Sequence, residues 1–121
     1  MITALIIFTS FAILALGIWL FLYFFEIVVV RGDSMYPTLK DGNIILMKKR
    51  VKISDLEVGA VYVYTNPYGQ SCVKRCASKL LIGHVIYVWF LGDNAEDSAD
   101  SRHHGHIKYQ DIEGKVLFPK L

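Results

Sequence analysis

The chain has 121 residues, of which 13 are basic and 11 acidic, and its formal net charge is +2 at pH 7. This near balance argues against a nucleic-acid-binding protein, which needs a strongly basic surface. All charged side chains lie within residues 26–121, a length that can form one modest hydrophobic core. We therefore expect an apolar N-terminal segment over residues 1–25 and one domain over residues 26–121.

Residues 4–25 are apolar apart from Thr9, Ser10 and Gly17. About 20 helical residues cross a hydrocarbon core of about 30 Å, so this segment can span a bilayer. It lacks the basic start, the shorter apolar region and the small-residue cleavage site of a cleavable signal peptide. A buried core helix is the other alternative, but a helix apolar on every face needs a larger protein around it. The segment is predicted to be a single-pass membrane anchor.

The charges that follow the span predict a cytoplasmic domain, because every Lys and Arg lies on its C-terminal side. The rule has little force for a chain with one span and a short N-terminal tail. The basic run 48–52 could touch anionic lipid headgroups, although a solvated strand end is the simpler interpretation. We assign this run no function from the sequence.

After the span, short apolar and β-branched runs between turn residues predict a small, mainly β, mostly antiparallel domain. No segment after residue 26 has a helical period, and no internal repeat is present. Pro37 disfavours helical backbone at Tyr36, so an irregular exposed loop is expected around Ser34. A further loop is expected over the polar run 92–106. The predicted strands are Ile27–Val30, Asn43–Met47, Val61–Tyr64, Ser71–Lys74, Ile86–Leu91 and Lys115–Phe118, with a hairpin turn at Asn66–Gly69.

Ser34 can act as a nucleophile only if a neighbouring base removes its proton. Alternation along the predicted strand places Lys74 on the same face as Cys72 and Cys76, opposite to Arg75. If that face is the core side, burial lowers the pKa of Lys74, because burial disfavours the charged form. A fall of about three units from about 10.4 makes the free amine well populated near neutral pH. A surface lysine on an edge strand is the alternative that the strand pattern leaves open.

Three segments resemble, in order and after a membrane span, the motif boxes of type I signal peptidases. They are Ser34-Met35-Tyr36-Pro37-Thr38-Leu39, Lys74-Arg75, and Gly92-Asp93-Asn94 followed by Ser98-x-Asp100-Ser101-Arg102-x-x-Gly105. Asp41 to Ile45 is also similar to the family's Gly-Asp-x-Val segment. The resemblance covers residues 2–118 and implies a membrane-anchored β domain of the signal peptidase type.

The resemblance implies a serine/lysine dyad. Ser34 would attack the scissile carbonyl, while Lys74 would act as general base and then as acid for the leaving amine. Ser98 matches the serine that, in the family, hydrogen-bonds the lysine amine and orients it. The backbone N–H of Ser34 would be the first oxyanion donor. Gly32, where some members have a serine, could offer only its backbone.

The resemblance also implies supporting residues and a setting for the reaction. A structural ion-pair cluster beneath the site would consist of Arg75, Asp100 and Arg102. Shallow apolar pockets for small substrate side chains would be formed by Met35, Val30 and Leu39. The substrates would be precursor proteins with signal or leader peptides, bound in extended form as an added strand. The implied enzyme needs no metal or organic cofactor. Its single span would lie in a plasma membrane or an organelle's inner membrane, with the catalytic domain on the exported side, against the charge rule.

The second motif box departs from typical members, which continue into a Gly-Leu-Pro-Gly-Asp-like turn where this chain has residues 76–83 of different composition. Only residues 75–91 separate Lys74 from Gly92, so the additional domain that many relatives insert there cannot fit. We expect a minimal catalytic core. A general processor of precursors and a maturation protease dedicated to few substrates both remain open.

Other chemistries are weaker alternatives. A Ser-His-Asp arrangement could use Asp33, but the adjacent His103 and His104 cannot readily aim at one partner. A metal site at His103, His104 and His106 lacks a clear carboxylate or cysteine partner. His84 is the remaining histidine.

The two cysteines, Cys72 and Cys76, would lie about 13 Å apart along a strand, beyond the reach of a disulfide, so free thiols are expected. A bulge that brings them together as a redox pair is the alternative. Two other protein classes are alternatives to the peptidase. A catalytically idle peptide-binding relative is disfavoured by the intact Ser34, Lys74 and Ser98. A self-cleaving repressor is disfavoured because a membrane span stands where its DNA-binding domain would be.

Overall fold

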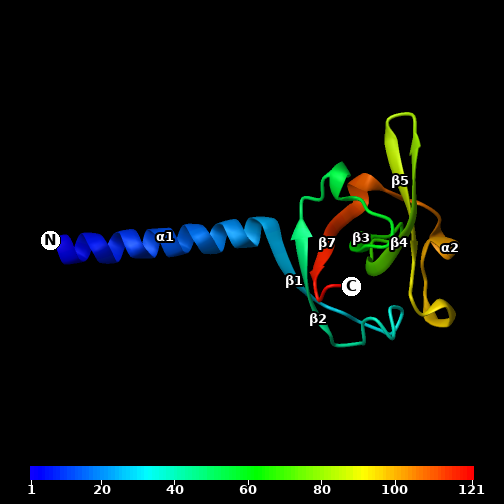
Figure 1. Cartoon of the computed structure of the whole chain (residues 1–121), viewed down its shortest axis with the longest axis horizontal. Helices are drawn as coiled ribbons and strands as arrows, with labels where there is room; N and C mark the ends of the chain where they lie inside the picture. Colours follow the sequence, from blue (N-terminus) through cyan, green and yellow to red (C-terminus); the bar gives the residue numbers. More distant parts are fainter.

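The computed structural model describes residues 1–121. A long helix, α1 (Ile2–Phe24), projects from a small β domain, and strand β1 (Phe25–Val29) follows it without a linker (Figure 1). Every residue of α1 is exposed, and the helix is long and apolar enough to cross a membrane. The hydroxyls of Thr9 and Ser10 donate to carbonyl oxygens one turn earlier, so these polar side chains are satisfied within the helix.

The domain is built on one sheet of seven antiparallel strands in the order β1-β2-β7-β3-β4-β5-β6. This confirms the predicted mainly β, antiparallel fold with one N-terminal apolar helix. The remaining strands are β2 (Ile44–Lys49), β3 (Val61–Thr65), β4 (Ser71–Ile82), β5 (Val85–Leu91), β6 (Ile107–Lys108) and β7 (Ile112–Phe118).

The predicted hairpin of β3 and β4 is confirmed, with Tyr62 directly opposite Lys74. Strand β4 is longer than expected, because it continues to Ile82 and pairs with β5 in a second hairpin. The turn of this hairpin lies at Gly83 and His84, and the hairpin projects from the domain (Figure 1). The segment after Lys74-Arg75 that departs from the usual motif is therefore strand.

The polar run 92–106 was expected to be loop throughout, but it contains a short helix, α2 (Ser101–His104). Four residues are too few to produce a helical period in the sequence. The helix is specified by its cap: the Asp100 side chain accepts a hydrogen bond from the Arg102 N–H. Three short 3-10 turns complete the domain, at Ile53–Asp55, Ala95–Asp97 and Tyr109–Asp111.

Strand β3 is the centre of the domain because both of its faces are buried. Tyr62 and Tyr64 pack against Phe90 in one apolar cluster, and the ring centroids of Tyr64 and Phe90 are 4.3 Å apart. Val61 and Val63 belong to a second cluster, which also contains Met35, Leu39, Ile45, Met47 and Val30. The loop between β1 and β2 thus contributes side chains to the core, which fixes its path.

Candidate active site

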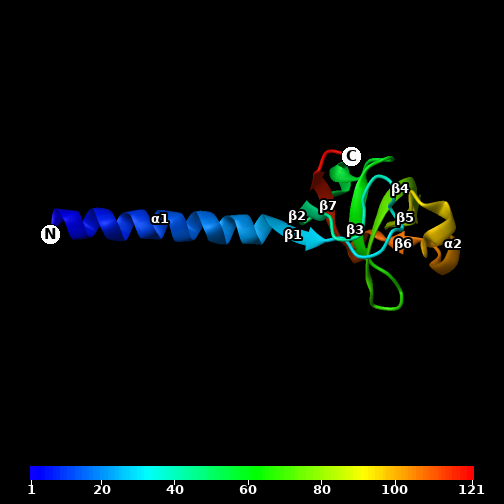
Figure 2. The same cartoon turned by 90° about the horizontal axis from the view of Figure 1, so that it is seen from below.

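Ser34 lies in the loop that joins β1 to β2, and this loop runs across toward β4 and β5 (Figure 2). Lys74 of β4 meets it there: Lys74 Nζ donates a hydrogen bond to Ser34 Oγ over 2.8 Å. When the amine is neutral, the serine hydroxyl can donate in the same contact. The fold therefore brings a hydroxyl and a candidate base together from positions 40 residues apart.

Lys74 is only 5 % exposed. Burial lowers its pKa below the ordinary lysine value, because the ammonium loses its hydration, while nearby Cys72 and Asp100 oppose this effect. No carboxylate forms an ion pair with the amine. Of the two alternatives that the strand pattern left open, the structure has the core-facing lysine.

Asp93 and Asn94 hold the serine loop in place, a role that the sequence did not predict. The Asn94 N–H donates to the Ser34 carbonyl oxygen over 2.8 Å, and Asn94 Nδ2 donates to the Asp33 carbonyl oxygen over 3.0 Å. The Thr38 hydroxyl donates to the Asp93 carboxylate. The sequence feature that could have indicated this role is the polar box Gly92-Asp93-Asn94 at the end of a predicted strand. These contacts set the position of Ser34 from both sides of the loop.

The expected cluster of Arg75, Asp100 and Arg102 is corrected to two separate ion pairs. Arg75 pairs with Asp93 in a two-pronged contact, Nε to Oδ1 at 2.9 Å and Nη2 to Oδ2 at 2.8 Å, and its Nη1 donates to the Gly59 carbonyl. Arg102 pairs with Asp100, Nε to Oδ1 and Nη2 to Oδ2 both at 3.0 Å. The reason is strand alternation, which places Arg75 and Lys74 on opposite faces of β4. Asp100 lies near Lys74 and therefore on the face away from Arg75.

Ser98 hydrogen-bonds Asp100 rather than Lys74, to which it makes no hydrogen bond. Its Oγ donates to Asp100 Oδ2 over 2.8 Å, and the Gly92 N–H donates to the same oxygen over 2.9 Å. A Cβ on Gly92 would lie 2.1 Å from Ser98 Oγ and 2.7 Å from the Ser34 carbonyl oxygen. Ser98 therefore packs against the backbone at Gly92, next to Ser34, and does not make the expected contact with the Lys74 amine.

Asp100 is fully buried, and burial by itself raises the pKa of a carboxyl. The hydrogen bonds from Arg102, from the Gly92 N–H and from Ser98 outweigh burial and hold the pKa of Asp100 well below its usual range. The carboxylate therefore stays charged at neutral and mildly acidic pH. Its oxygens are occupied by donors that organise the segment behind Ser34.

A cavity of about 220 Å³ opens beside Ser34 and Lys74. Its walls come from β1 and from the first half of β4, although three strands separate these two in the sheet order, so the sheet is curled. Neither wall has a strand on its cavity side: β1 pairs only with β2, and β4 pairs with β5 only from Arg75 onward. The lining residues are Val28, Val29, Val30, Arg31, Ser34, Val63, Ser71, Cys72, Val73 and Lys74.

Of the three residues expected in substrate pockets, Val30 lines this cavity. Met35 and Leu39 do not line it, and both are buried in the core cluster beneath the serine loop. The resemblance implied that Met35 and Leu39 would line substrate pockets, but their apolar side chains are buried in the core instead.

The two candidate oxyanion donors differ in availability. The Gly32 N–H donates to Asp41 Oδ1 over 2.7 Å, so it is already engaged. The Ser34 N–H makes no hydrogen bond within the chain. Gly32 has a positive φ of 81°, which suits a glycine at this turn.

Cys72 and Cys76 are free thiols, and their surroundings differ. Cys72 lines the cavity, whereas Cys76 is buried beside Phe90. A maleimide is therefore expected to label Cys72 alone and to block peptide cleavage, and a Cys72→Ala variant should keep its activity under the reagent. Mass spectrometry of the labelled protein identifies the site. Modification of Cys76 first, or inhibition that persists in Cys72→Ala, would contradict this prediction.

No histidine is hydrogen-bonded to Ser34. His104 Nε2 is 3.0 Å from the Tyr64 hydroxyl, and His106 packs against the Trp89 ring. The chain has no group of three His, Cys, Asp or Glu side chains placed to hold a metal ion.

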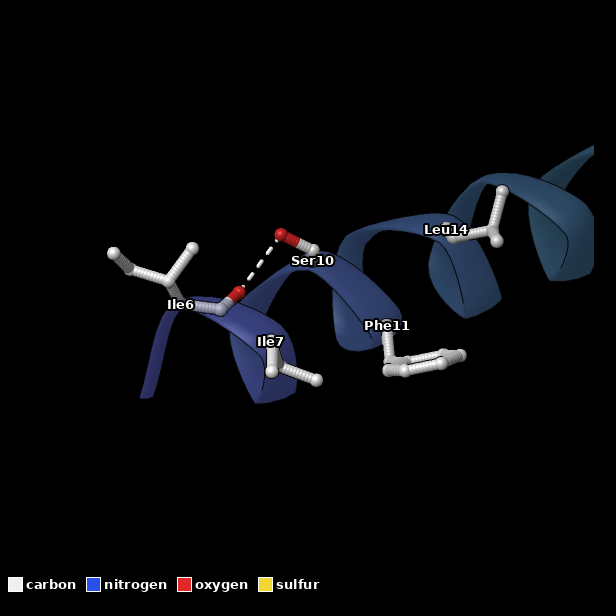
Figure 3. Close-up of a pocket in the computed structure, with 5 residues that line it drawn as sticks. All are labelled: Ile6, Ile7, Ser10, Phe11 and Leu14. Carbon is white, nitrogen blue, oxygen red and sulfur yellow. Dashed lines mark hydrogen bonds between the residues drawn. The ribbon is translucent and has the colours of Figure 1, made fainter. Parts of the chain in front are cut away.

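A second hollow, of about 350 Å³, lies on the surface of α1 and is lined by residues of that helix alone (Figure 3). Four of its five side chains are apolar, and the fifth, Ser10, donates its hydroxyl to the Ile6 carbonyl over 2.7 Å. No other element faces it and no unpaired polar side chain points into it. It is a gap between side chains on the apolar helix and has none of the features of a catalytic site.

A serine hydroxyl bonded to a buried lysine amine, beside a cavity with free strand edges, is an arrangement suited to hydrolysis of a peptide bond. Residues 2–79 and 85–121 match the sequence model of the family described as signal peptidase, peptidase S26. The chain belongs to this family, and it is accordingly a peptidase. The unmatched residues 80–84 form the tip of the β4–β5 hairpin.

Named relatives agree with this assignment. The chain is 27% identical over 115 residues to mitochondrial inner membrane protease subunit 1 of Xenopus tropicalis, covering 79% of this chain and 69% of that protein. It is 31% identical over 117 residues to the protein of the same name in Schizosaccharomyces pombe, covering 78% and 73%. It is 33% identical over 96 residues to signal peptidase complex catalytic subunit SEC11 of Chaetomium globosum, covering 75% and 55%.

Proposed function

We propose that this chain is a membrane-anchored serine endopeptidase that removes signal or leader peptides from exported precursor proteins. The observation that carries the proposal is the 2.8 Å contact between Lys74 Nζ and Ser34 Oγ beside a strand-lined cavity. Burial lowers the pKa of the Lys74 amine and so favours its neutral form, which is the form that can accept a proton. Helix α1 would be the anchor, and the catalytic domain would lie on the exported side.

In the proposed mechanism, Ser34 Oγ attacks the scissile carbonyl while Lys74 takes the hydroxyl proton. Lys74 then gives this proton to the leaving amine, which leaves an acyl group on Ser34. A water molecule, deprotonated by Lys74, attacks this acyl group, and the proton passes to Ser34 Oγ as the acid product leaves. The free N–H of Ser34 is the donor proposed for the developing oxyanion. The reaction needs no cofactor, because the acid, the base and the nucleophile all come from the chain.

The substrate is proposed to bind in extended form between β1 and β4, with its backbone paired to one or both free edges. Val30, with the other valines of the cavity, would contact the small side chains that precede the cut. Met35 and Leu39 would pack beneath Val30 in the core and so support this part of the cavity. Ser98 would act as a positioning residue through Asp100 and Gly92.

A dedicated maturation protease is the second form of the same proposal. The relatives carry names of subunits of an inner membrane protease and of a signal peptidase complex. A partner subunit and a restricted set of precursors are therefore part of what has to be tested. A peptide-binding protein without catalysis is disfavoured by the contact between Ser34 and Lys74.

The test is cleavage by the full chain reconstituted in lipid. The substrates are a generic precursor with small residues at the first and third positions before the cut, and precursors encoded near the gene. We expect one new N-terminus, identified by sequencing, and none with Ser34→Ala. Cleavage of a neighbouring gene's product alone would favour the dedicated form. Equal cleavage by Ser34→Ala, or none of any precursor by the wild type, would overturn the proposal.

A further inference from the structure

The junction between α1 and the β domain has no linker, a feature that the proposed cleavage mechanism does not use. Strand β1 begins at the residue after α1 ends, and the same strand forms one wall of the cavity beside Ser34. Because no linker separates them, the conformation of this junction sets how the cavity is held relative to the end of the helix (Figure 1).

Arg50, at the end of β2, lies against this junction. Its guanidinium carbon is 3.6 Å from the centroid of the Tyr23 ring, and Tyr23 in turn stacks on Trp19 at 5.5 Å. Arg50 is the one residue other than glycine with a positive φ, 56°, a conformation that is unfavourable for a branched or long side chain. The turn after β2 thus adopts an uncommon backbone that places a cation on the last turns of α1.

The positive charges here are only partly neutralised. Lys48 is paired with Asp55 at 3.0 Å, whereas Lys49, Arg50 and Lys52 form no ion pair. The one acidic residue that lines the adjoining cavity with Lys49 is Glu26. Lys49 and Arg50 are therefore unpaired cations that lie beside the end of α1.

Beside these cations is a cavity of about 360 Å³ in the angle between α1 and β1. Its lining is apolar except at Glu26 and Lys49, and it also contains Phe21, Leu22, Phe25 and Ile27. This cavity suits a ligand with an apolar part, which would contact the apolar lining, and an anionic part, which would lie near Lys49 and Arg50. Aromatic rings and basic side chains at the end of a span are also the groups that meet a lipid headgroup layer.

We infer that the junction formed by Lys49, Arg50 and Tyr23 is a binding site for the headgroup of an anionic phospholipid from the bilayer that α1 enters. The inference rests on the proposed role of α1 as a membrane span. The occupied site would brace β2 against α1 and so hold the cavity beside Ser34 at a fixed height and angle over the membrane surface.

The test uses the full chain and its two tryptophans, Trp19 in α1 and Trp89 in β5. In a Trp89→Phe background, Trp19 alone reports on nearby lipid. The protein is reconstituted in vesicles of phosphatidylcholine and phosphatidylglycerol, with one or the other lipid brominated on its acyl chain. We expect stronger quenching by the brominated anionic lipid. Arg50→Gln should reduce this preference by about fivefold, since one basic residue at the surface contributes about that factor, and Lys49→Gln should act similarly.

Lys108→Gln is the matched control, because it removes the same charge from β6, at the far side of the domain from α1 (Figure 2). Its preference should equal that of the parent. Equal quenching by the two lipids in the parent protein would overturn the headgroup site while leaving the span intact. Absence of quenching by either lipid would instead overturn the span, and with it the anchor in the proposed function. A preference that survives both Arg50→Gln and Lys49→Gln would also refute the site.

Discussion

Replacing Lys74 with methionine is expected to abolish peptide cleavage and, at neutral pH, to stabilise the folded protein. The loss of the base should lower the rate by about 10³-fold or more, because Ser34 would have no group to take its proton. The gain in stability arises because Lys74 is only 5 % exposed, so its amine binds a proton more readily in the unfolded chain than in the folded protein. Each unit by which burial lowers the pKa corresponds to about 1.4 kcal/mol.

The sign of the pH effect follows from the lowered pKa of Lys74. Above the ordinary lysine pKa the amine is neutral in both states, so it does not favour unfolding. As the pH falls toward the lowered, folded-state pKa, the unfolded chain binds the proton first and the wild type loses stability relative to Lys74→Met. Below the folded-state pKa the difference is constant. In the wild type, cleavage should rise with pH through this lowered pKa.

Two lysine variants control the experiment. Lys74→Arg keeps a charge that cannot serve as a base, so it should be inactive without the gain in stability. Lys79→Met removes an amine that lies further along the same strand and donates to the Leu56 carbonyl, and it should leave the rate unchanged. Thermal unfolding in detergent at several pH values, together with initial cleavage rates, measures both effects. Substantial cleavage by Lys74→Met would remove the lysine from the mechanism.

Gly92→Ala is expected to damage the site although Gly92 does not line the cavity beside Ser34. A Cβ there would lie 2.1 Å from Ser98 Oγ and 2.7 Å from the Ser34 carbonyl oxygen, distances at which atoms must shift. Moving Ser98 would disturb its bond to Asp100, and moving Ser34 would break its alignment with Lys74. We expect a loss of stability of about 1–3 kcal/mol and a loss of rate of about 10²-fold.

Gly69→Ala separates this steric effect from the general effect of replacing a glycine. Gly69 lies in the β3–β4 turn with a φ of 81°, and nothing lies within 4 Å of a Cβ placed on it. The variant should lose stability through backbone strain but keep its rate. The two variants are compared by urea unfolding and by cleavage rate normalised to folded protein. An unimpaired rate in Gly92→Ala would show that the backbone behind Ser34 tolerates displacement.

Several features of this chain followed from local sequence. The apolar helix and the β3–β4 hairpin were predicted because hydrophobic length and a turn between two β-branched runs are local signals. The length of β4 was missed, because Leu80, Leu81 and Ile82 pair with β5 in an exposed hairpin that depends on a partner strand. The short helix after Asp100 was missed because a single turn leaves no periodicity.

The site was predicted less completely than the fold. Ser34 and Lys74 were named from motifs, but the alternation of β4 could not say which of its faces is buried. The partners of Arg75 and Ser98 were assigned wrongly, because ion pairs and hydrogen bonds depend on distances between segments. The roles of Asp93 and Asn94 could not be predicted for the same reason: their partners Thr38 and Asp33 precede them by 55 and 61 residues.

The sequence by itself determined the apolar helix, the β character of the domain and the residue types available for chemistry, because these depend on composition and on short-range patterns. Only the tertiary structure decided that Lys74 faces inward and lies 2.8 Å from Ser34. The physical reason is that the desolvation of the amine and its contact with the hydroxyl both arise from the curled sheet. That curl brings the loop after β1 over β4, and no local pattern in either segment contains it.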